Sequence, residues 1–449
     1  MKLSAIILAA GQGKRMNSTL PKVMHKLAGM PMLEHVYLRS LELAANDIHI
    51  VYGHGGEHLH EYCSEFDVEW ILQEEQLGTA HAVQQASPHI NDEHVVLILY
   101  GDVPLIKSHT LKKLVNSVTA ETIALLTVNL HDPTGYGRII RKNGQVVAIV
   151  EHKDASDEQK LIKEVNTGIM ALPAGYLNRC LHRIDNKNVQ REYYLTDVIA
   201  LAVNDGKNVK TSQPDYVYEV EGVNDRNQLS KLERIKQRER VDAIMAQGVT
   251  VADPSRVDIR GEITVGNDSF IDINCIFEGK VTIGSNVSIG PGCVINDSQI
   301  ADDVVIKPYS IIEQTMIDKR VEVGPFARIR PGTHLKEGCK VGNFVEVKNT
   351  QLGFGSKANH LTYLGDAVIG SDVNIGAGTI TCNYDGAYKH KTVIMDGAFI
   401  GSDTQLVAPV KVGKNSTIGA GSTITRDTDD DALTLSRVEQ KTIDGWKRP

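Results

Sequence analysis

The sequence predicts two domains of different class: a doubly wound, Rossmann-like α/β domain over residues 1–226, and a parallel β-helix of hexapeptide repeats over residues 248–449. Three observations predict this division. Apolar, strand-like runs alternate with helical patterns up to about residue 225. A charged segment without Gly or Pro follows, and apolar residues then recur at every sixth position. A chain of 449 residues also exceeds what one hydrophobic core usually holds.

In the first domain, the alternation predicts a mostly parallel sheet with helices on both faces. The apolar run over 3–10 is expected to be its first, buried strand. A signal peptide is the alternative, but Lys14 and Arg15 follow the run where small, cleavable residues should continue. The other clear candidates are strands at 48–52, 95–100 and 123–128, and helices at 31–45 and 78–90.

Residues 227–247 are predicted to form a helix that links the two domains. Leu229, Leu232, Ile235 and Val241 share one stripe at helical spacing. A helix of this length spans roughly 30 Å, enough to hold two domains apart. A helix that lies on a membrane surface is disfavoured because the apolar stripe is thin.

The second domain follows a period of six. The first apolar series is Val265, Ile271, Phe277, Ile283, Ile289 and Ile295, and after one-residue shifts the period continues to Ile424. Three hexads make one triangular turn, so this region predicts about nine coils of a parallel β-helix. Cys275 and Cys293 are 18 residues apart at a small, inward position, which Cys339 also occupies, and we expect all three to fill the core.

Composition excludes some functions. The net charge is −8 and there is no basic stripe with interleaved aromatic residues, so no nucleic-acid partner is expected. No stretch approaches transmembrane length. The six cysteines form neither a CxxC pair nor a Cys/His cluster, which is typical of a reduced, cytoplasmic protein.

A loop at 8–16 follows the first predicted strand and contains Gly11 and Gly13. Such loops let backbone N–H groups approach phosphate oxygens. The cations Lys14, Arg15 and Lys22 lie close by in the sequence, which favours phosphate binding over a plain flexible turn. The loop has neither the GK[ST] of a P-loop nor the third Gly of a dinucleotide fingerprint.

Asp102 ends the predicted strand at 95–100, at the edge of the sheet where α/β proteins bind ligands. A carboxylate there is a natural ligand for Mg²⁺ carried by phosphates. A helix cap is the alternative role for a single Asp at a strand end.

These residues resemble the signature of sugar-1-phosphate nucleotidyltransferases. The matching segments are Leu8–Gly11, Arg15-Met16, Pro21-Lys22, Gln73, Gly78-Thr79, Tyr100–Asp102, Gly135–Arg138, Glu151, Asn166–Gly168 and Asn224. With the second half, the resemblance covers essentially the whole chain. It is to the family of bifunctional bacterial N-acetylglucosamine-1-phosphate uridyltransferase/glucosamine-1-phosphate N-acetyltransferases, which make UDP-N-acetylglucosamine for peptidoglycan and lipopolysaccharide.

The resemblance implies roles for residues of the first domain. The nucleotide of UTP would be held by Leu8, Ala9, Ala10, Gly11 and Lys22, with Tyr100 and Gly101 beside them, and Arg15 would act at the reacting phosphates. Uracil would be recognised by Gln73, Gly78 and Thr79. The sugar would be held by Gly137, Glu151 and Asn166, and Mg²⁺ by Asp102 and Asn224.

In the second domain, polar residues break the hexad pattern together. Arg330 and Lys348 take positions where Gly or Asp usually follows the apolar residue, and the segments 357–366 and 381–391 interrupt the repeat. Insertions in solenoids gather on a binding face. A catalytic β-helix is therefore favoured over a scaffold that only joins subunits or regulates the first domain. A third alternative, a protein that only binds sugar nucleotides, is opposed by Asp102 and Asn224.

By the same resemblance, His360 would be the catalytic base of acetyl transfer. The sugar phosphate would be bound by Arg330, Lys348, Tyr363, Asn374 and Lys389. Acetyl-CoA would be bound by Ala377, Asn383, Tyr384, Ser402, Ala420 and Arg437. The resemblance also implies a left-handed coil, a homotrimer, and glucosamine-1-phosphate and N-acetylglucosamine-1-phosphate as further small-molecule substrates.

Overall fold

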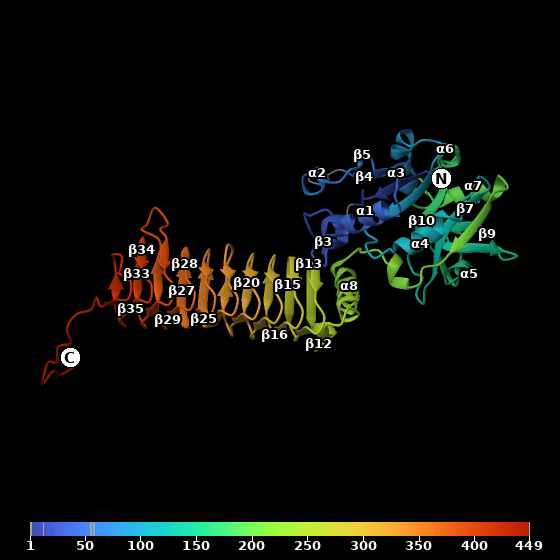
Figure 1. The fold of residues 1–449 in the computed structure, drawn as a ribbon. Helices are drawn as coiled ribbons and strands as arrows, with labels where there is room; N and C mark the ends of the chain where they lie inside the picture. The colour runs from blue at the N-terminus through green and yellow to red at the C-terminus, as the bar shows by residue number, and fades with distance from the viewer. Residues whose placement is uncertain (1, 12, 54–55, 57–58, 449) are drawn as a thin grey trace. The chain divides into compact units, whose positions relative to one another are not determined.

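The computed structural model describes residues 2–11, 13–53, 56 and 59–448 (Figure 1). The chain divides into two compact units, Met1–Lys236 and Gln237–Pro449. Among the described residues, no helix combines the length and the apolar character that a membrane span needs.

The first unit is built on a nine-stranded sheet whose main order is β11-β7-β10-β6-β1-β4-β5. In this order neighbouring strands run parallel, except that β10 is antiparallel to both β6 and β7; β8, off this order, is antiparallel to both β10 and β9. The strands are β1 Leu3–Leu8, β4 Asp47–Gly53, β5 Glu69–Gln73, β6 Val95–Tyr100, β7 Thr122–Asn129, β8 Arg138–Lys142, β9 Gln145–Val150, β10 Glu164–Pro173 and β11 Asn208–Ser212, with a separate pair β2 Lys26–Leu27 and β3 Met30–Pro31. The three strands predicted at 48–52, 95–100 and 123–128 are confirmed.

Helices cover both faces of this sheet, as predicted. Residues of α1 and α4 pack in the core on one face, and residues of α3, α6 and α7 pack on the other. Every residue of β1 is buried, as expected for a central strand covered on both sides. The helices are α1 Met32–Glu42, α2 Leu59–Tyr62, α3 Thr79–Ala86, α4 Ser108–Val115, α5 Asp157–Lys160, α6 Ala174–Leu181 and α7 Asp197–Asn204, with short 3-10 turns η1 Lys14–Met16, η2 Lys22–Met24, η3 Ser87–His89 and η4 Val217–Val220.

The helix predicted at 227–247 is α8, Arg226–Met245, and its two halves belong to different cores. Leu232 is buried in the first unit, where Leu229 and Ile235 pack beside it. Val241 and Ile244 are buried in the core of the second unit. The helix is therefore an integral part of both units and more than a spacer between them.

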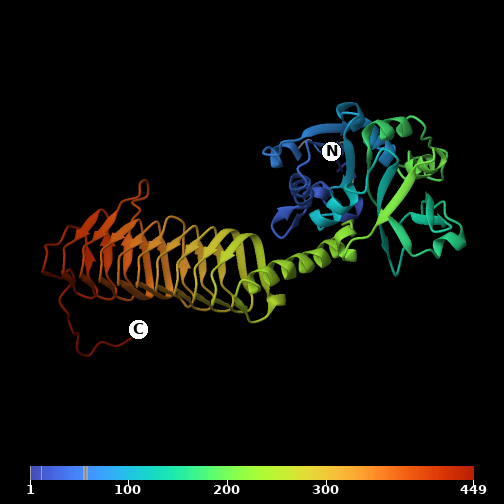
Figure 2. The ribbon, with the colours of Figure 1, turned by 45° about the vertical axis from the view of Figure 1, so that its right-hand side comes forward.

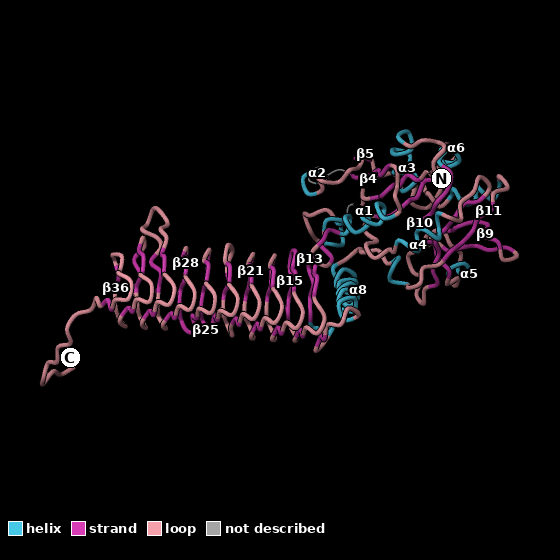
Figure 3. The backbone as a smooth tube through the Cα atoms, viewed as in Figure 1, coloured by secondary structure: helices cyan, strands magenta, loops and turns pink. Residues whose placement is uncertain are grey.

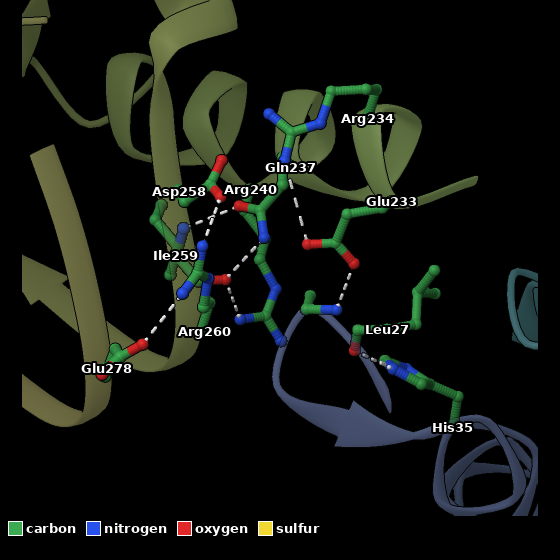
Figure 4. A network of polar contacts seen from close by, with 11 residues as sticks. Leu27, His35, Glu233, Arg234, Gln237, Arg240, Asp258, Ile259, Arg260 and Glu278 are labelled. Atoms are coloured by element: carbon green, nitrogen blue, oxygen red, sulfur yellow. Dashed lines mark hydrogen bonds and ion pairs between the residues drawn. The ribbon is translucent and has the colours of Figure 1, made fainter. Parts of the chain in front are cut away.

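Side chains of α8 also satisfy the backbone of the first coil (Figure 4). The amide of Gln237 donates to Ile259 O at 3.0 Å and accepts from Ile259 N at 2.7 Å. Arg240 donates to the carbonyls of Ile259 and Gly261 at 3.0 and 2.6 Å. The terminal strand β13 thus has the partners that a further coil would otherwise supply.

The second unit is a parallel β-helix with three faces, in which strands stack from coil to coil (Figures 2 and 3). Face 1 contains β12 Thr250–Val251, β14 Phe270–Ile271, β16 Ser288–Ile289, β19 Val305–Ile306, β22 Glu322–Val323, β29 Asn374–Ile375, β32 Phe399–Ile400, β35 Thr417–Ile418 and β37 Leu433–Thr434. Face 2 contains β17 Val294–Asn296, β20 Ile311–Glu313, β23 Arg328–Ile329, β30 Ile380–Cys382, β33 Gln405–Val407 and β36 Thr423–Ile424. Face 3 contains β18 Gln299–Ile300, β21 Met316–Ile317, β24 His334–Leu335, β26 Gln351–Leu352, β28 Ala367–Ile369, β31 Thr392–Ile394 and β34 Val410–Val412.

Four longer strands run over two faces. Faces 2 and 3 share β13 Val257–Val265 and β15 Cys275–Ile283, and faces 1 and 2 share β25 Lys340–Lys348 and β27 Lys357–Gly365. The turn η5, Pro254–Arg256, precedes the first of them. We call the turn after face 1 corner 1–2, and the turn after face 2 corner 2–3.

The predicted hexad residues form the core of the coil. Ile271, Ile289 and Ile306 pair in successive coils and are at most 1% exposed. Cys275, Cys293 and Cys339 are buried, which confirms them as core residues. The segment at 381–391 lengthens one coil, since Ile369 pairs with Ile394, 25 residues on, whereas Leu352 pairs with Ile369, 17 residues on. The left-handed sense of the coil stays a prediction from the resemblance.

Candidate functional sites

A cavity of about 370 Å³ lies in the first unit at the carboxyl edge of β1 and β6. The register of these strands pairs Leu8 with Tyr100, so the loops that follow both strands reach the same edge. Gln12 of the predicted loop lies outside the described residues. The predicted site residues that line the cavity are Leu8, Ala9, Ala10, Gly11, Lys22, Gln73, Gly78, Thr79, Tyr100 and Asp102.

Gly101 lies behind the loop instead of lining the cavity. Its N–H donates to Leu8 O at 2.9 Å. A Cβ at this position would lie 3.2 Å from side-chain atoms of both Leu33 and Val23 and 3.5 Å from Ala9. The lack of a side chain lets the loop and the core meet here.

The residues predicted to recognise uracil gather at the start of α3. Gln73 is only 2% exposed, and its amide donates to Gly78 O at 3.3 Å and lies 3.1 Å from His81 Nδ1. Gly78 has φ of 121°, and a Cβ there would lie 2.5 Å from Tyr193 O, so the backbone requires glycine. Thr79 Oγ1 accepts from Leu195 N at 3.1 Å.

A second cavity, of about 280 Å³, shares Tyr100 and Asp102 with the first. Arg15 and Asn224 also line it, so the cation and the amide oxygen predicted to act near the phosphates lie at this second opening. A ligand that filled both cavities would pass Asp102, because this residue belongs to each of them.

The three residues predicted to hold the sugar lie together and line neither cavity. Asn166 N donates to Gly137 O at 2.9 Å, and Glu151 accepts from Thr196 Oγ1 at 3.1 Å. Burial raises the pKa of the Glu151 carboxyl. Burial also raises the pKa of Tyr100, with the nearby charges of Glu151 and Asp102 acting in the same direction. Tyr136 and Thr167, the chain neighbours of Gly137 and Asn166, line the second cavity, so the group lies next to it.

Asp102 and Asn224 fit a hard divalent cation. Oxygen atoms of both side chains converge on one cation, the ammonium of Lys22, which bonds to Asp102 Oδ2 and donates to Asn224 Oδ1 at 3.2 Å. Carboxylate and amide oxygens are the donors that Mg²⁺ prefers, and it usually takes its other ligands from water and substrate phosphates. In the described part of the chain, no group of three or more His, Cys, Asp or Glu side chains is arranged to hold a metal ion.

The cavities contain residues that the sequence did not indicate. Gln76 lines the first cavity, and its amide donates to Ala10 O, which ties the segment around Gln73 to the glycine loop. Glu192 also lines this cavity, and its Cβ would lie 3.1 Å from a Cβ at Gly78. In the second cavity the residues not singled out are Val103, Thr134, Val220, Gly222 and Gln228. Only the short distance from Gln73 and Gly78 in the sequence could have drawn attention to Gln76.

In the second unit, three predicted cations gather at corner 2–3. Ile329 pairs with Val347, so Arg330 and Lys348, which follow them, lie on neighbouring coils. Lys389 comes from the hairpin at 381–391, which projects from the coil (Figure 1) and is closed by a bridge between Tyr384 and Lys389. Contact with the Lys389 ammonium lowers the pKa of Lys348, with a smaller effect from Arg330. Such a concentration of positive charge suits a phosphate.

Asp366 fixes this corner, although neither the hexad pattern nor the resemblance assigns it a role of its own. Its carboxylate accepts from Asn349 Nδ2 at 2.6 Å and from Asn383 Nδ2, the latter on the hairpin. Burial opposes ionisation, but these hydrogen bonds and the charges of Lys348 and Lys389 lower the pKa of the Asp366 carboxyl. The residue therefore joins the hairpin to the coil as an ionised anchor.

His360 lies at corner 1–2, at the opposite border of face 2. Asn343 pairs with His360 across β25 and β27, and Asn343 Oδ1 lies 2.9 Å from His360 Nδ1. An amide oxygen can only accept, so Nδ1 carries the hydrogen and Nε2 is left as the basic nitrogen. The same corner of later coils contains three of the predicted residues, Ala377, Ser402 and Ala420. Each directly precedes a residue with a left-handed backbone conformation. Arg437 donates to Ala420 O at 3.0 Å.

A single chain does not bring all predicted acetyltransferase residues together. Tyr363 pairs with Glu346 on face 2, between the two corners. Asn374 pairs with Lys357 on face 1, away from Lys348. Asn383 and Tyr384 belong to the hairpin of corner 2–3, whereas the other predicted acetyl-CoA residues lie at corner 1–2 or bond to it.

The chain is similar to known proteins over its full length. Residues 5–167 match the MobA-like NTP transferase domain, residues 259–352 the GMPPB C-terminal domain, and residues 391–426 the bacterial transferase hexapeptide family, with six repeats. The "Bifunctional protein GlmU" of Nitrosospira multiformis is 56% identical over 450 residues, covering 100% of this chain and 98% of that protein. A solved nucleotidyl transferase from Methanothermobacter thermautotroptrophicus is 16% identical with a TM-score of 0.39, covering 53% of this chain and 99% of that one.

Proposed function

We propose how two transfer reactions are divided between the two units of this chain, which belongs to the family of the bifunctional protein GlmU. The chain is an enzyme with both activities: it acetylates glucosamine-1-phosphate with acetyl-CoA, and it transfers UMP from UTP to N-acetylglucosamine-1-phosphate, releasing pyrophosphate. The observation that supports the division best is that the predicted residues for each reaction gather within one unit.

In uridylyl transfer, the first cavity takes the nucleotide. The loop at 8–11 faces the phosphates, and Gln73 with Gly78 and Thr79 faces uracil. The sugar phosphate enters from the side of Glu151 and Asn166, and one of its phosphate oxygens attacks the α-phosphorus of UTP while pyrophosphate leaves. Lys22 and Arg15 supply positive charge to the phosphates, because phosphoryl-type transfer depends on positioning and charge neutralisation.

Asp102 and Asn224 would hold Mg²⁺ in this site. The bound ion would neutralise charge that develops on the reacting phosphates. The convergence of two oxygen donors on one cation supports this assignment.

In acetyl transfer, Arg330, Lys348 and Lys389 hold the phosphate of glucosamine-1-phosphate, with Tyr363 and Asn374 against the sugar. His360 Nε2 takes a proton from the amino group as the nitrogen attacks the thioester carbonyl and the thiolate of coenzyme A leaves. Histidine suits this step because it can accept a proton at neutral pH.

The acetyltransferase site is shared between copies of the chain, and we propose a homotrimer. Asn374 on face 1 cannot reach a ligand held by Lys348 at corner 2–3 of the same chain, and the acetyl-CoA residues are divided between two corners. A neighbouring copy would supply the missing half. Light scattering that reports a fully active monomer would contradict this.

The enzyme acts in the cytoplasm, where its nucleotide and acetyl-CoA substrates are made.

One assay tests the proposed function. The purified chain is given acetyl-CoA and glucosamine-1-phosphate, with and without UTP and Mg²⁺. Coenzyme A should be released in both cases, and UDP-N-acetylglucosamine and pyrophosphate should form only with UTP. A protein that makes UDP-N-acetylglucosamine from N-acetylglucosamine-1-phosphate but releases no coenzyme A would support the scaffold alternative for the β-helix.

A further inference from the structure

The ammonium of Lys22 lies between the two side chains assigned to the metal. Lys22 begins the turn η2, Asp102 follows β6, and Asn224 precedes α8, so the contact joins segments 80 and 202 residues apart. The side chains of Lys22 and Asp102 are only 11% and 17% exposed, so water screens this ion pair less than one on the surface. Asn224 Oδ1 accepts from the same ammonium at 3.2 Å.

The ammonium and a divalent cation compete for these oxygens. Both are hard cations that prefer carboxylate and amide oxygen, and two positive charges so close together in a half-buried site repel each other strongly. A divalent ion therefore binds Asp102 and Asn224 only after the Lys22 ammonium has moved. The chain supplies its own cation for this position.

The surroundings of Lys22 offer the ammonium a second position. Lys22 lines the cavity that contains the glycine loop, and Asp102 lies at the junction of this cavity with the second one. Rotation about the bonds of the lysine side chain can turn the ammonium from Asp102 toward the loop without moving the backbone. Phosphates bound at that loop would attract it.

We propose that Lys22 occupies the metal position while the nucleotide site is empty, and that the phosphates of the nucleotide release Asp102 and Asn224 by drawing the ammonium away. This inference rests on the assignment of the metal to Asp102 under the proposed function. It implies that nucleotide and divalent cation bind cooperatively, and that the nucleotide-free enzyme binds the cation weakly.

The test is a titration of the full-length protein with Mn²⁺ in the absence of nucleotide, in which electron paramagnetic resonance measures the concentration of free Mn²⁺. Lys22→Gln should bind Mn²⁺ at least about tenfold more tightly than the wild type, because the competing cation is gone. Arg15→Gln is the matched control. Arg15 also lines the cavity of Asp102 and Asn224, but only Lys22 among the described residues bonds to both, so its loss should change the affinity less than about threefold.

The double variant Lys22→Gln/Asp102→Asn separates failure of this inference from failure of the metal assignment. Loss of the gained affinity in the double variant supports both. If Lys22→Gln binds no more tightly than the wild type, or if Arg15→Gln gains as much, the inference is overturned while the metal assignment stands. If the double variant binds as tightly as Lys22→Gln, the metal does not bind at Asp102 and both are overturned.

Discussion

The two units assemble their sites in opposite ways. In the α/β unit, Lys22, Asp102 and Asn224 meet although they are far apart in the sequence. The segments with Lys22 and Asp102 follow β1 and β6, whose carboxyl ends share one edge of the sheet, and Val223 N donates to Asp102 O at 2.9 Å, which brings Asn224 beside them. In the β-helix, Arg330 and Lys348 meet because they are one coil apart. The contacts between site residues of the first unit thus follow from its topology, whereas the stacking of Arg330 and Lys348 in the second unit follows from the period.

This difference predicts that substitutions at either site stay confined to one reaction. Each site is formed within a unit that has its own core, so a substitution at one site is not expected to alter the packing around the other. The predictions below test this separation, from the largest expected effect to the smallest.

The largest effect is expected for His360→Ala, which should lower the rate of acetyl transfer by about 10²–10⁴-fold, the usual contribution of a positioned base. Uridylyl transfer should be unchanged. Both activities are measured on one preparation, with thermal melting as the folding control. His390→Ala is the matched variant: His390 pairs with Asp385 in the hairpin, 2.7 Å away, and its loss should raise KM more than it lowers kcat. A folded His360→Ala protein that acetylates at the wild-type rate would remove His360 from the mechanism.

Asp102→Asn should lower uridylyl transfer by about 10²–10³-fold, because a neutral amide holds a divalent cation more weakly than a carboxylate does. Acetyl transfer should remain within about twofold of the wild type. Equal losses of both activities would show that the substitution acts through folding, and the two sites would not be independent.

Asn343→Ala should lower kcat of acetyl transfer by about tenfold, a positioning effect smaller than loss of the base itself. Without the amide oxygen, His360 Nδ1 no longer has the acceptor that fixes its tautomer and ring orientation. The pH profile of kcat distinguishes this role from a structural one, since it should change in Asn343→Ala. An unchanged profile would assign Asn343 to packing alone.

The smallest effect concerns the pH dependence of sugar-phosphate binding. Lys348 attracts phosphate while it is protonated, and contact with Lys389 lowers its pKa. As the pH increases, KM for glucosamine-1-phosphate should therefore begin to rise at a lower pH than that at which an ordinary lysine loses its proton. Lys389→Met removes this repulsion, so the pKa of Lys348 should increase. The rise in KM should then move to higher pH, although KM itself is larger at every pH. A rise that stays at the same pH would show that Lys348 does not control it.

The sequence predicted the periodic part of the molecule more completely than the rest. The hexads identified the buried residues of the coil, and the breaks at Arg330 and Lys348 pointed to a real cationic corner. The period alone did not show that Asn374 lies on another face from Lys348, because that depends on where each coil turns. The link between the hairpin and Asp366 was also not predictable, since it depends on how an irregular insertion folds back.

In the α/β unit, the resemblance identified most of the residues that line the first cavity. It did not reveal the contact of Gln76 with Ala10 or that of Lys22 with Asp102. Such contacts join segments with no common period, so they follow only from the packed fold. The same holds for α8. Its apolar stripe predicts a linker helix, but Leu232 of that stripe is buried in the core of the first unit.

The central claim, two units that each carry one reaction, is tested most directly by dividing the chain. Fragments 1–236 and 237–449 keep both halves of α8 with the cores they contact. We expect the first to keep uridylyl transfer and lose acetyl transfer, and the second to keep acetyl transfer alone. A shorter fragment, 1–226, follows the boundary predicted from sequence and lacks Leu232. Its free energy of unfolding should be lower than that of 1–236 by about 2–5 kcal/mol, the usual effect of removing a buried leucine side chain. Acetyl transfer by fragment 1–236, or no uridylyl transfer by that fragment when folded, would contradict the account.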